Sequence, residues 1–266
     1  MLSKKECVVC FGVNAAQPRD CPELARSDFP SGVKSIRDSL LKFNFRGDFL
    51  FWDKSYPEGC PEHAVSPHAF KPFCFYEAKK RGYDIVLWLD ASVKIQKPIE
   101  PIFDLIKKDG YFFIQELTCG RKEEDLGVRG RNENVGEFCK DDALKTLGIT
   151  REESFKIPSC WSAIVGLDLS TQIPAEFLRQ WKEKALDGIT FSGPRLSGIL
   201  GWPQTASSDY RVRGHLSDQP AASVIAWKLG MRNWHTREFL FEFMQVDRNS
   251  VRILKEVFED KNSRVS

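Results

Sequence analysis

The stretch Asp84–Ile95, DIVLWLDASVKI, decides the fold that we expect for this chain. Its residues from Ile85 to Leu89 are all apolar, which is typical of a strand buried on both faces of a sheet. Asp90 follows at the point where such a strand leaves the core. A carboxylate there either begins a turn or holds a metal ion over a substrate, and the stretch alone leaves both interpretations open.

The composition is that of an ordinary folded protein. The 266 residues suffice for one α/β domain or two small ones, and we expect a single domain over residues 1–266. The 39 Lys and Arg against 37 Asp and Glu give a net charge of +2. That balance argues against a nucleic-acid partner attracted by bulk charge, although a local basic pocket for phosphate remains compatible with it.

The cysteines and the apolar runs indicate the compartment that we expect. No stretch approaches transmembrane length, and the amino-terminal apolar run is too short for a secretory signal. We therefore expect a cytoplasmic protein whose eight cysteines are reduced. Cys7 and Cys10 form a C-x-x-C within a strand-like run, where this spacing sends the two side chains to opposite faces, so we expect core or surface thiols and not a zinc or redox pair.

Strand-like and helix-like stretches alternate along the chain, which predicts a sheet with helices on its faces. The predicted strands are Cys7–Val13, Asp48–Trp52, Asp84–Leu89, Val93–Ile95, Tyr111–Gln115 and Trp161–Leu167. The predicted helices are Gly32–Phe43, Ala69–Arg81, Glu100–Lys108, Glu137–Leu147, Ala175–Leu186, Asp218–Leu229 and one more after Asn249. Two long loops, Gly120–Glu133 and Phe191–Arg213, are predicted to lie near a ligand.

Two strand ends carry residues that suit ligand binding. Open α/β sheets bind ligands at the carboxyl ends of their strands. The first strand ends in Phe11-Gly12-Val13-Asn14, and the strand of the opening stretch ends in Asp90-Ala91-Ser92. Carboxylate oxygens are preferred ligands of Mg²⁺ and Mn²⁺, and the Ser92 hydroxyl can reach such an ion through water.

Three further positions each allow a structural and a functional interpretation. In His215-Leu216-Ser217-Asp218-Gln219-Pro220, Ser217 suits a helix N-cap and Asp218 the first turn, so this is either a plain helix start or one that presents Asp218 and Gln219 to a ligand. Lys71, in PHAFKPF, is either solvated or placed to neutralise a diphosphate. His235, beside Trp234, is either packed or a ligand.

Taken together, these residues resemble glycosyltransferases of the GT-A type, which use nucleotide-diphosphate sugars. The resemblance rests on HAFKPFCFYEAKKRGYDIVLWLDASVKI, on PIFDLIKKDGYFFIQE and on GHLSDQPAASVIAWKLGM, and it extends over Cys7 to His235. The order of these motifs is similar to that of transferases of bacterial and large-DNA-virus surface glycans. The resemblance implies a mixed, mainly parallel sheet flanked by helices. It further implies a nucleotide-binding half over about residues 1–115, a sugar-binding half over about 116–248 and a tail over 249–266.

The resemblance also implies roles for individual residues. Phe11 to Asn14 would cradle the nucleoside and Lys71 would face the diphosphate. The metal motif of the family, D-x-D, reads Asp90-Ala91-Ser92 here, so a serine stands in place of the second acid, and His235 is the match for a late histidine that completes the metal site. The remaining contacts, to the donor or acceptor sugar, would come from Gln115, Glu116, His215, Asp218 and Gln219.

The expected activity is transfer of a hexose from UDP-glucose or UDP-galactose to a glycan or glycoprotein acceptor, assisted by Mn²⁺ or Mg²⁺. Asp218 would stabilise an oxocarbenium-like anomeric carbon, or Asp218 or Asp209 would serve as base for the acceptor hydroxyl; family analogy slightly favours retention. Two alternatives remain. A sugar-nucleotide nucleotidyltransferase would need a glycine-rich basic loop after the first strand. A non-catalytic carbohydrate-binding domain would be compatible with the missing second acid.

Overall fold

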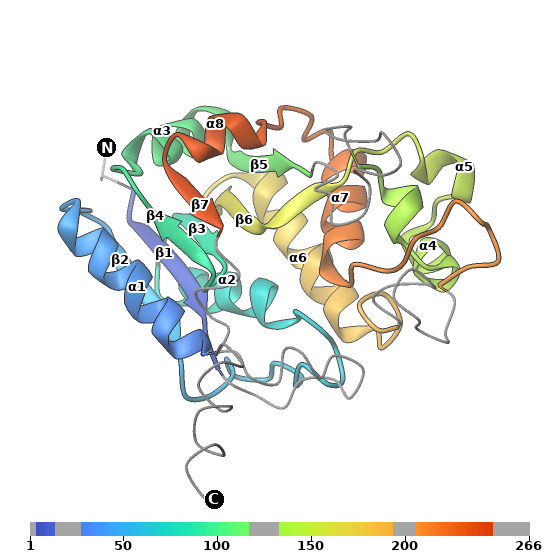
Figure 1. The fold of residues 1–266 in the computed structure, drawn as a ribbon, viewed down its shortest axis with the longest axis horizontal. Coiled ribbons are helices and arrows are strands. Elements are labelled where there is room, and N and C mark those ends of the chain that lie inside the picture. The colour runs from blue at the N-terminus through green and yellow to red at the C-terminus, as the bar shows by residue number, and fades with distance from the viewer. Residues whose placement is uncertain (1–3, 14–27, 117–132, 194–205, 247–266) are drawn as a thin grey trace, which may run out of the picture.

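A five-stranded sheet organises the protein. The structure, a computed structural model, describes residues 4–13, 28–116, 133–193 and 206–246. The strands run in the order β2-β1-β3-β6-β5 (Figure 1). Their bounds are Glu6–Phe11 for β1, Asp48–Trp52 for β2, Ile85–Leu89 for β3, Tyr111–Gln115 for β5 and Cys160–Asp168 for β6.

One strand of this sheet runs against the others. β1 pairs in parallel with β2 and β3, whereas β6 is antiparallel to both β3 and β5. The predicted mixed, mainly parallel sheet is thus confirmed. As a result, one edge of the sheet gathers the carboxyl ends of β1, β2, β3 and β5 together with the beginning of β6, and the candidate residues follow these ends.

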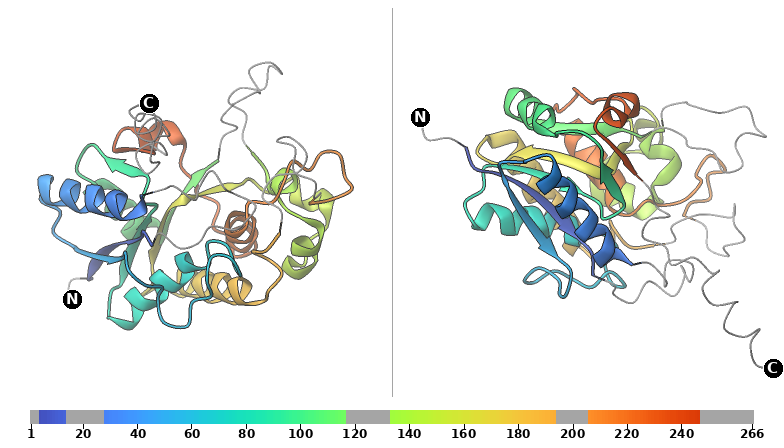
Figure 2. Two further views of the ribbon diagram at one scale, coloured as in Figure 1. Left: turned by 60° about the horizontal axis from the view of Figure 1, so that its bottom comes forward. Right: turned by 60° about the vertical axis from the view of Figure 1, so that its left-hand side comes forward.

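Helices cover both faces of the sheet. On one face lie α1 (Phe29–Lys42), α3 (Glu100–Asp109) and α8 (Arg237–Phe241), and on the other α2 (Phe70–Lys80), α6 (Gln172–Leu186) and α7 (Asp218–Lys228) (Figure 2). The smaller elements are η3 (Val135–Phe138), α4 (Asp141–Leu147), α5 (Arg151–Ser154) and a two-stranded sheet of β4 (Val93–Ile95) with β7 (Met244–Val246). Within the described residues, no helix combines the length and the apolar character needed to cross a bilayer.

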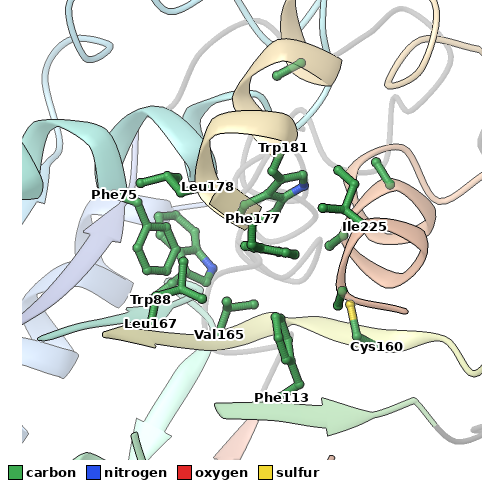
Figure 3. Close-up of a cluster of buried hydrophobic side chains, with 14 of the residues drawn as sticks. Phe75, Trp88, Phe113, Cys160, Val165, Leu167, Phe177, Leu178, Trp181 and Ile225 are labelled. Carbon is green, nitrogen blue, oxygen red and sulfur yellow. The ribbon is translucent and has the colours of Figure 1, made fainter. Parts of the chain in front are cut away.

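The core on the α2–α6–α7 face is rich in aromatic rings (Figure 3). The rings of Phe113 and Phe177 meet edge to face at 5.3 Å, and Phe177 lies 5.5 Å from Trp181. Trp181 is fully buried, and its Nε1 donates a hydrogen bond of 3.2 Å to the carbonyl oxygen of Asp218. A buried indole needs such a partner, so the core itself fixes where α7 begins.

The two cysteines of the C-x-x-C motif lie on opposite faces of β1. Cys7 belongs to the core cluster on the α2 side and Cys10 to the cluster on the α1 side, and both are free thiols. Burial raises the pKa of both thiols far above the usual range. The expectation of core thiols at these two positions is confirmed.

The predicted helix Glu137–Leu147 is wrong as one element. The chain forms the 3-10 helix η3, turns extended at Cys139 (φ −131°, ψ 126°), and only then enters α4. The carbonyl oxygens of Glu137 and Phe138 accept hydrogen bonds from the amides of Arg213 and Leu216. Because a distant loop uses these acceptors, a continuous helix does not form through them.

The short elements α5, α8 and β7 were not predicted. They have four, five and three residues, too few for a periodic pattern to show. The helix predicted after Asn249 lies outside the described residues, as do most of the predicted loop Gly120–Glu133 and part of Phe191–Arg213.

Candidate active site

Three charged side chains from three separate elements meet at the carboxyl edge of the sheet. Lys71 Nζ lies 3.1 Å from Asp218 Oδ2 and 3.5 Å from Asp90 Oδ1. The same nitrogen donates hydrogen bonds to the carbonyl oxygen (2.9 Å) and the hydroxyl oxygen (3.1 Å) of Ser162 on β6. Three residues singled out from separate parts of the sequence, Lys71, Asp90 and Asp218, therefore belong to one cluster.

Asp90 is both a turn residue and a member of this cluster. Its amide donates to Ala163 on β6 (2.9 Å), and its carbonyl oxygen accepts from the amide of Val93 (2.9 Å), which closes the turn from β3 to β4. Its Oδ1 also accepts a 2.8 Å hydrogen bond from Nε1 of Trp88. Lys71 and Trp88 both approach Oδ1, and within the described part of the chain Oδ2 has no such contact. The two interpretations left open by the sequence are compatible.

Lys71 and Asp218 each lie in the first turn of a helix that follows a strained residue. α2 is preceded closely by His68 (φ 65°) and α7 directly by Ser217 (φ 52°, ψ −103°). Residues other than glycine rarely adopt such positive φ values, and backbone strain of this kind concentrates at functional sites. Ser217 is the N-cap residue of α7 as predicted, but its side chain makes no capping hydrogen bond.

Burial controls the charges of the cluster. The side chain of Asp90 is 33% exposed, whereas those of Lys71 and Asp218 are 4% and 3% exposed. Burial raises the pKa of Asp218, and the nearby Lys71 ammonium counteracts this. For Lys71, burial acts to lower the pKa, but Asp218 and Asp90 together outweigh it and raise the pKa. The buried lysine is therefore a cation held by two carboxylates, and Asp90 is the most exposed member of the cluster.

The end of β1 lies against the first turn of α2. The ring of Phe11 stacks on that of Phe70 at 4.1 Å with an interplanar angle of 10°. Packing requires a glycine at position 12, because a Cβ atom there would lie 2.4 Å from Val33 Cγ2 and 2.8 Å from the carbonyl oxygen of Phe29. Val13 ends the described segment and Asn14 lies outside it. The nucleotide-binding role of Phe11 to Asn14 stays a prediction.

The end of β5 carries a buried ion pair. Gln115 is the last residue of β5, and the next residue, Glu116, is buried and accepts a hydrogen bond from Nη2 of Arg237 on α8. The guanidinium of Arg237 lies 3.9 Å from the ring centre of Trp161. The amide of Glu116 donates to the carbonyl oxygen of Ser159 (2.7 Å).

Gln219 lies at the same edge, next to the cluster. Its Nε2 donates to the hydroxyl oxygen of Ser159 (2.9 Å), and Ser159 also binds the backbone of Glu116. Two of the predicted sugar contacts, Glu116 and Gln219, thus share one neighbour. Sequence reasoning missed Arg237, Ser162 and Trp88. The only signal for such partners was an acid that follows an apolar strand, because a carboxylate there needs a partner when it is buried.

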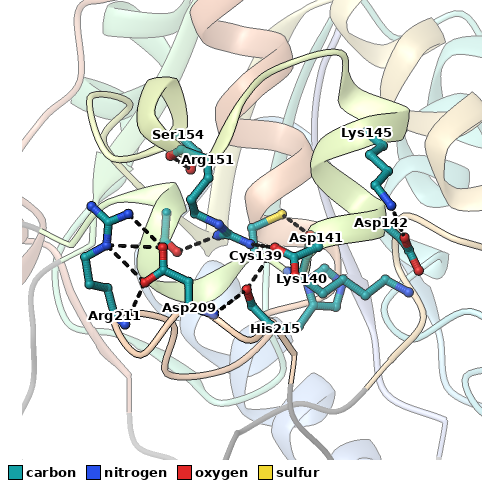
Figure 4. A network of polar contacts seen from close by, with 12 residues as sticks. Cys139, Lys140, Asp141, Asp142, Lys145, Arg151, Ser154, Asp209, Arg211 and His215 are labelled. Atoms are coloured by element: carbon teal, nitrogen blue, oxygen red, sulfur yellow. Dashed lines mark hydrogen bonds and ion pairs between the residues drawn. The ribbon is translucent and has the colours of Figure 1, made fainter.

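Asp209 and His215 belong to a different polar network (Figure 4). Asp209 forms paired hydrogen bonds with the guanidinium of Arg211, which lower the pKa of this carboxyl to about 2. His215 is fully buried and lies between the amide of Lys140 (3.4 Å) and the carbonyl oxygen of Thr190 (2.9 Å). A carboxylate of such low pKa is a weak base, and none of the polar contacts described for these two residues involves Lys71, Asp90 or Asp218.

Within the described residues, neither of the two other predicted metal ligands makes a polar contact with Lys71 or Asp218. Ser92 is buried in the turn between β3 and β4. The ring of His235 stacks on Phe112 (4.9 Å) and packs against Phe239 (5.1 Å), beyond the free side of β5, and burial lowers the pKa of this histidine. Across the described segments, no group of three or more His, Cys, Asp or Glu residues is arranged to hold a metal ion. Of the three predicted ligands, Asp90 alone is placed in the cluster.

Comparison with known proteins finds glycosyltransferases among the similar solved structures. No family model and no curated protein matches the chain. Similar solved structures include a glycosyltransferase involved in glycosylation of the major capsid of PBCV-1 (12% identity over 69% of this chain and 68% of that one, TM-score 0.38). Mouse xyloside xylosyltransferase 1 (11%, 87% and 84%, 0.41) and core-mannan synthase A from Aspergillus fumigatus in an Mn/GDP form (10%, 85% and 70%, 0.36) are also similar. The roles assigned to single residues rest on this chain's own geometry.

Proposed function

We propose that this protein transfers a hexose from a nucleotide-diphosphate donor to a glycan or glycoprotein acceptor. The observation that carries the proposal is the meeting of Asp90, Lys71 and Asp218 at the carboxyl edge of the sheet, in a chain whose motifs resemble those of GT-A glycosyltransferases. UDP-glucose or UDP-galactose is the donor that we propose. The near-neutral net charge of +2 offers no bulk attraction for nucleic acid.

Asp90 fits the role of protein ligand to Mn²⁺ or Mg²⁺. Its carboxylate is one third exposed, and its Oδ1 takes both contacts with the protein, which leaves Oδ2 for a hard cation. When bound, such an ion offsets the negative charge that develops on the leaving diphosphate. Ser92, two residues after Asp90, and His235, whose ring packs on Phe112 and Phe239, remain predicted ligands.

Asp218 is the carboxylate that we propose to act on the donor sugar. It is the first residue of α7, where the helix dipole favours its ionised form against the effect of burial. A carboxylate beside the anomeric carbon stabilises positive charge as the glycosidic bond breaks. Asp209 is the weaker candidate, because its carboxylate is committed to Arg211. We favour retention, in which the acceptor proton passes to the departing phosphate.

Neighbouring side chains suit the sugar itself. Gln219 and Glu116 lie together around Ser159, and the amide and carboxylate groups of such side chains bind sugar hydroxyls. We therefore propose that these two residues, with Gln115, contact the donor or acceptor sugar. His215, whose two ring nitrogens are both used inside the protein, would support the loop before α7.

The test is a donor screen with a charge-neutral variant. UDP with Mn²⁺ should raise the melting temperature of the wild type, and UDP-glucose or UDP-galactose should be hydrolysed slowly without acceptor. Asp90→Asn should abolish the effect of Mn²⁺ and lower hydrolysis by about 100-fold, the size expected when one electrostatic contact to the transition state is lost. Asp104→Asn, at an exposed acid of α3, is the matched control and should behave as the wild type. Failure of every nucleotide to bind would refute the proposal.

A further inference from the structure

The ammonium group of Lys71 is fully engaged by the protein. Four oxygen atoms surround Nζ: two of Ser162 and one each of Asp218 and Asp90, at 2.9 to 3.5 Å. An ammonium has three hydrogens to donate, and the side chain is 4% exposed. A phosphate could receive a hydrogen bond from Lys71 only if one of these oxygens gave up its own.

We propose that Lys71 is a positioning residue that holds the carboxylates of Asp90 and Asp218 at one point and does not contact the diphosphate of the donor. This inference rests on the proposed function and changes the role that the sequence resemblance implies for this lysine. In this role Lys71 connects α2 to the end of β3 and to the start of α7, and its hydrogen bonds to Ser162 hold it against β6.

Electrostatics explains why such a link is needed. Asp90 and Asp218 carry like charges and come from elements 128 positions apart in the chain, so nothing local holds them together. Two carboxylates at one buried point repel each other unless a cation lies between them. Contact of one ammonium with both carboxylates offsets that repulsion and holds Oδ1 of Asp90 at 3.5 Å from Nζ.

The place of Lys71 in its helix supports the same conclusion. It lies in the first turn of α2, which has no side-chain capping bond. The amino-terminal end of a helix carries partial positive charge and disfavours a cation. A lysine that is both buried and at this end is held there by its ion pairs, so its position depends on the two carboxylates as theirs depends on it.

The experiment separates positioning from phosphate binding. Lys71→Met should lower the melting temperature by about 6 to 20 °C, because a buried carboxylate loses its partner. It should also lower kcat by about 100-fold, the effect of a small misplacement of reacting groups. The Kd of UDP, measured without a divalent ion so that metal binding by Asp90 plays no part, should stay within about threefold of wild type. The value of kcat is expressed per UDP-binding site. Lys79→Met, at an exposed lysine of the same helix, is the matched control.

Several outcomes would overturn the inference. A Kd for UDP raised tenfold or more without a divalent ion, the loss expected of a charge-assisted hydrogen bond, would make Lys71 a phosphate ligand. An unchanged kcat per binding site would show that Lys71 contributes to stability alone. An unchanged melting temperature would show that its contacts with Asp90 and Asp218 do not stabilise the protein.

A second variant keeps the test valid if Lys71→Met does not fold. The double variant Lys71→Met/Asp218→Asn removes both buried charges and should regain stability. Without a divalent ion, its Kd for UDP should equal that of Asp218→Asn alone, and a tenfold weaker Kd would contradict positioning. If the wild type binds no nucleotide, the proposed function fails, whereas loss and recovery of the melting temperature would still support the link.

Discussion

His215 offers a prediction whose size follows from the structure. Its ring is fully buried, its Nδ1 accepts from the amide of Lys140, and its Nε2 faces the carbonyl oxygen of Thr190 (Figure 4). Because the Thr190 oxygen only accepts, the neutral ring must carry its hydrogen on Nε2. Burial and the positive charge of Lys140 lower the pKa of His215 to about 3.

This lowered pKa makes stability depend on pH with a definite sign. Histidine in an unfolded chain has a pKa of about 6.5. Above that value His215 is neutral in both the folded and the unfolded state and contributes no pH dependence. As the pH falls from 6.5 towards 3, His215 binds a proton in the unfolded state but not in the folded state, so the unfolding free energy falls. At pH 5, about 1.5 units below the unfolded pKa, the loss of unfolding free energy is about 2 kcal/mol.

Urea unfolding of the wild type and His215→Gln at pH 7.5 and pH 5 measures this effect. Glutamine can offer one acceptor and one donor in similar places, so the variant should fold and should be about 1 kcal/mol less stable at pH 7.5. Between the two pH values the wild type should lose about 2 kcal/mol more than the variant. All other titrating groups are shared and cancel in the difference. Equal losses in the two proteins would refute a neutral, buried His215.

Two further predictions concern the residues around the candidate site. Gly12→Ala should lower the unfolding free energy by about 1 to 3 kcal/mol, because its Cβ would meet Val33 and the backbone of Phe29 at 2.4 and 2.8 Å, and a urea midpoint equal to wild type would contradict this packing role. Glu116→Gln should cost about 3 to 5 kcal/mol because it leaves the buried Arg237 without its counter-charge. Thermal unfolding should show recovery in Glu116→Gln/Arg237→Met, and a double variant less stable than Glu116→Gln would contradict the pairing.

The sequence by itself determined most of the elements and the three charged residues of the cluster. A run such as Ile85–Leu89 is apolar at every position because both faces of the strand are buried, and that information is local. The ends of strands and helices are local too, so Asp90, Lys71 and Asp218 could be selected from their places after a strand or in the first turn of a helix. Even the opposite faces of Cys7 and Cys10 follow from spacing alone.

Only the tertiary structure decided which of these candidates meet. β6 enters the sheet in reverse between β3 and β5, and this order brings Ser162 to Lys71 and Ser159 to Glu116. Glu116 finds Arg237 at a separation of 121 residues, and no periodic pattern specifies such a pair. Periodicity records which face of an element is buried, whereas strand order and partner choice depend on how all the faces pack at once. For that reason the sequence predicted Asp90 as a turn or a ligand, and only the packing of α2 and α7 against the sheet edge placed its carboxylate beside a buried lysine.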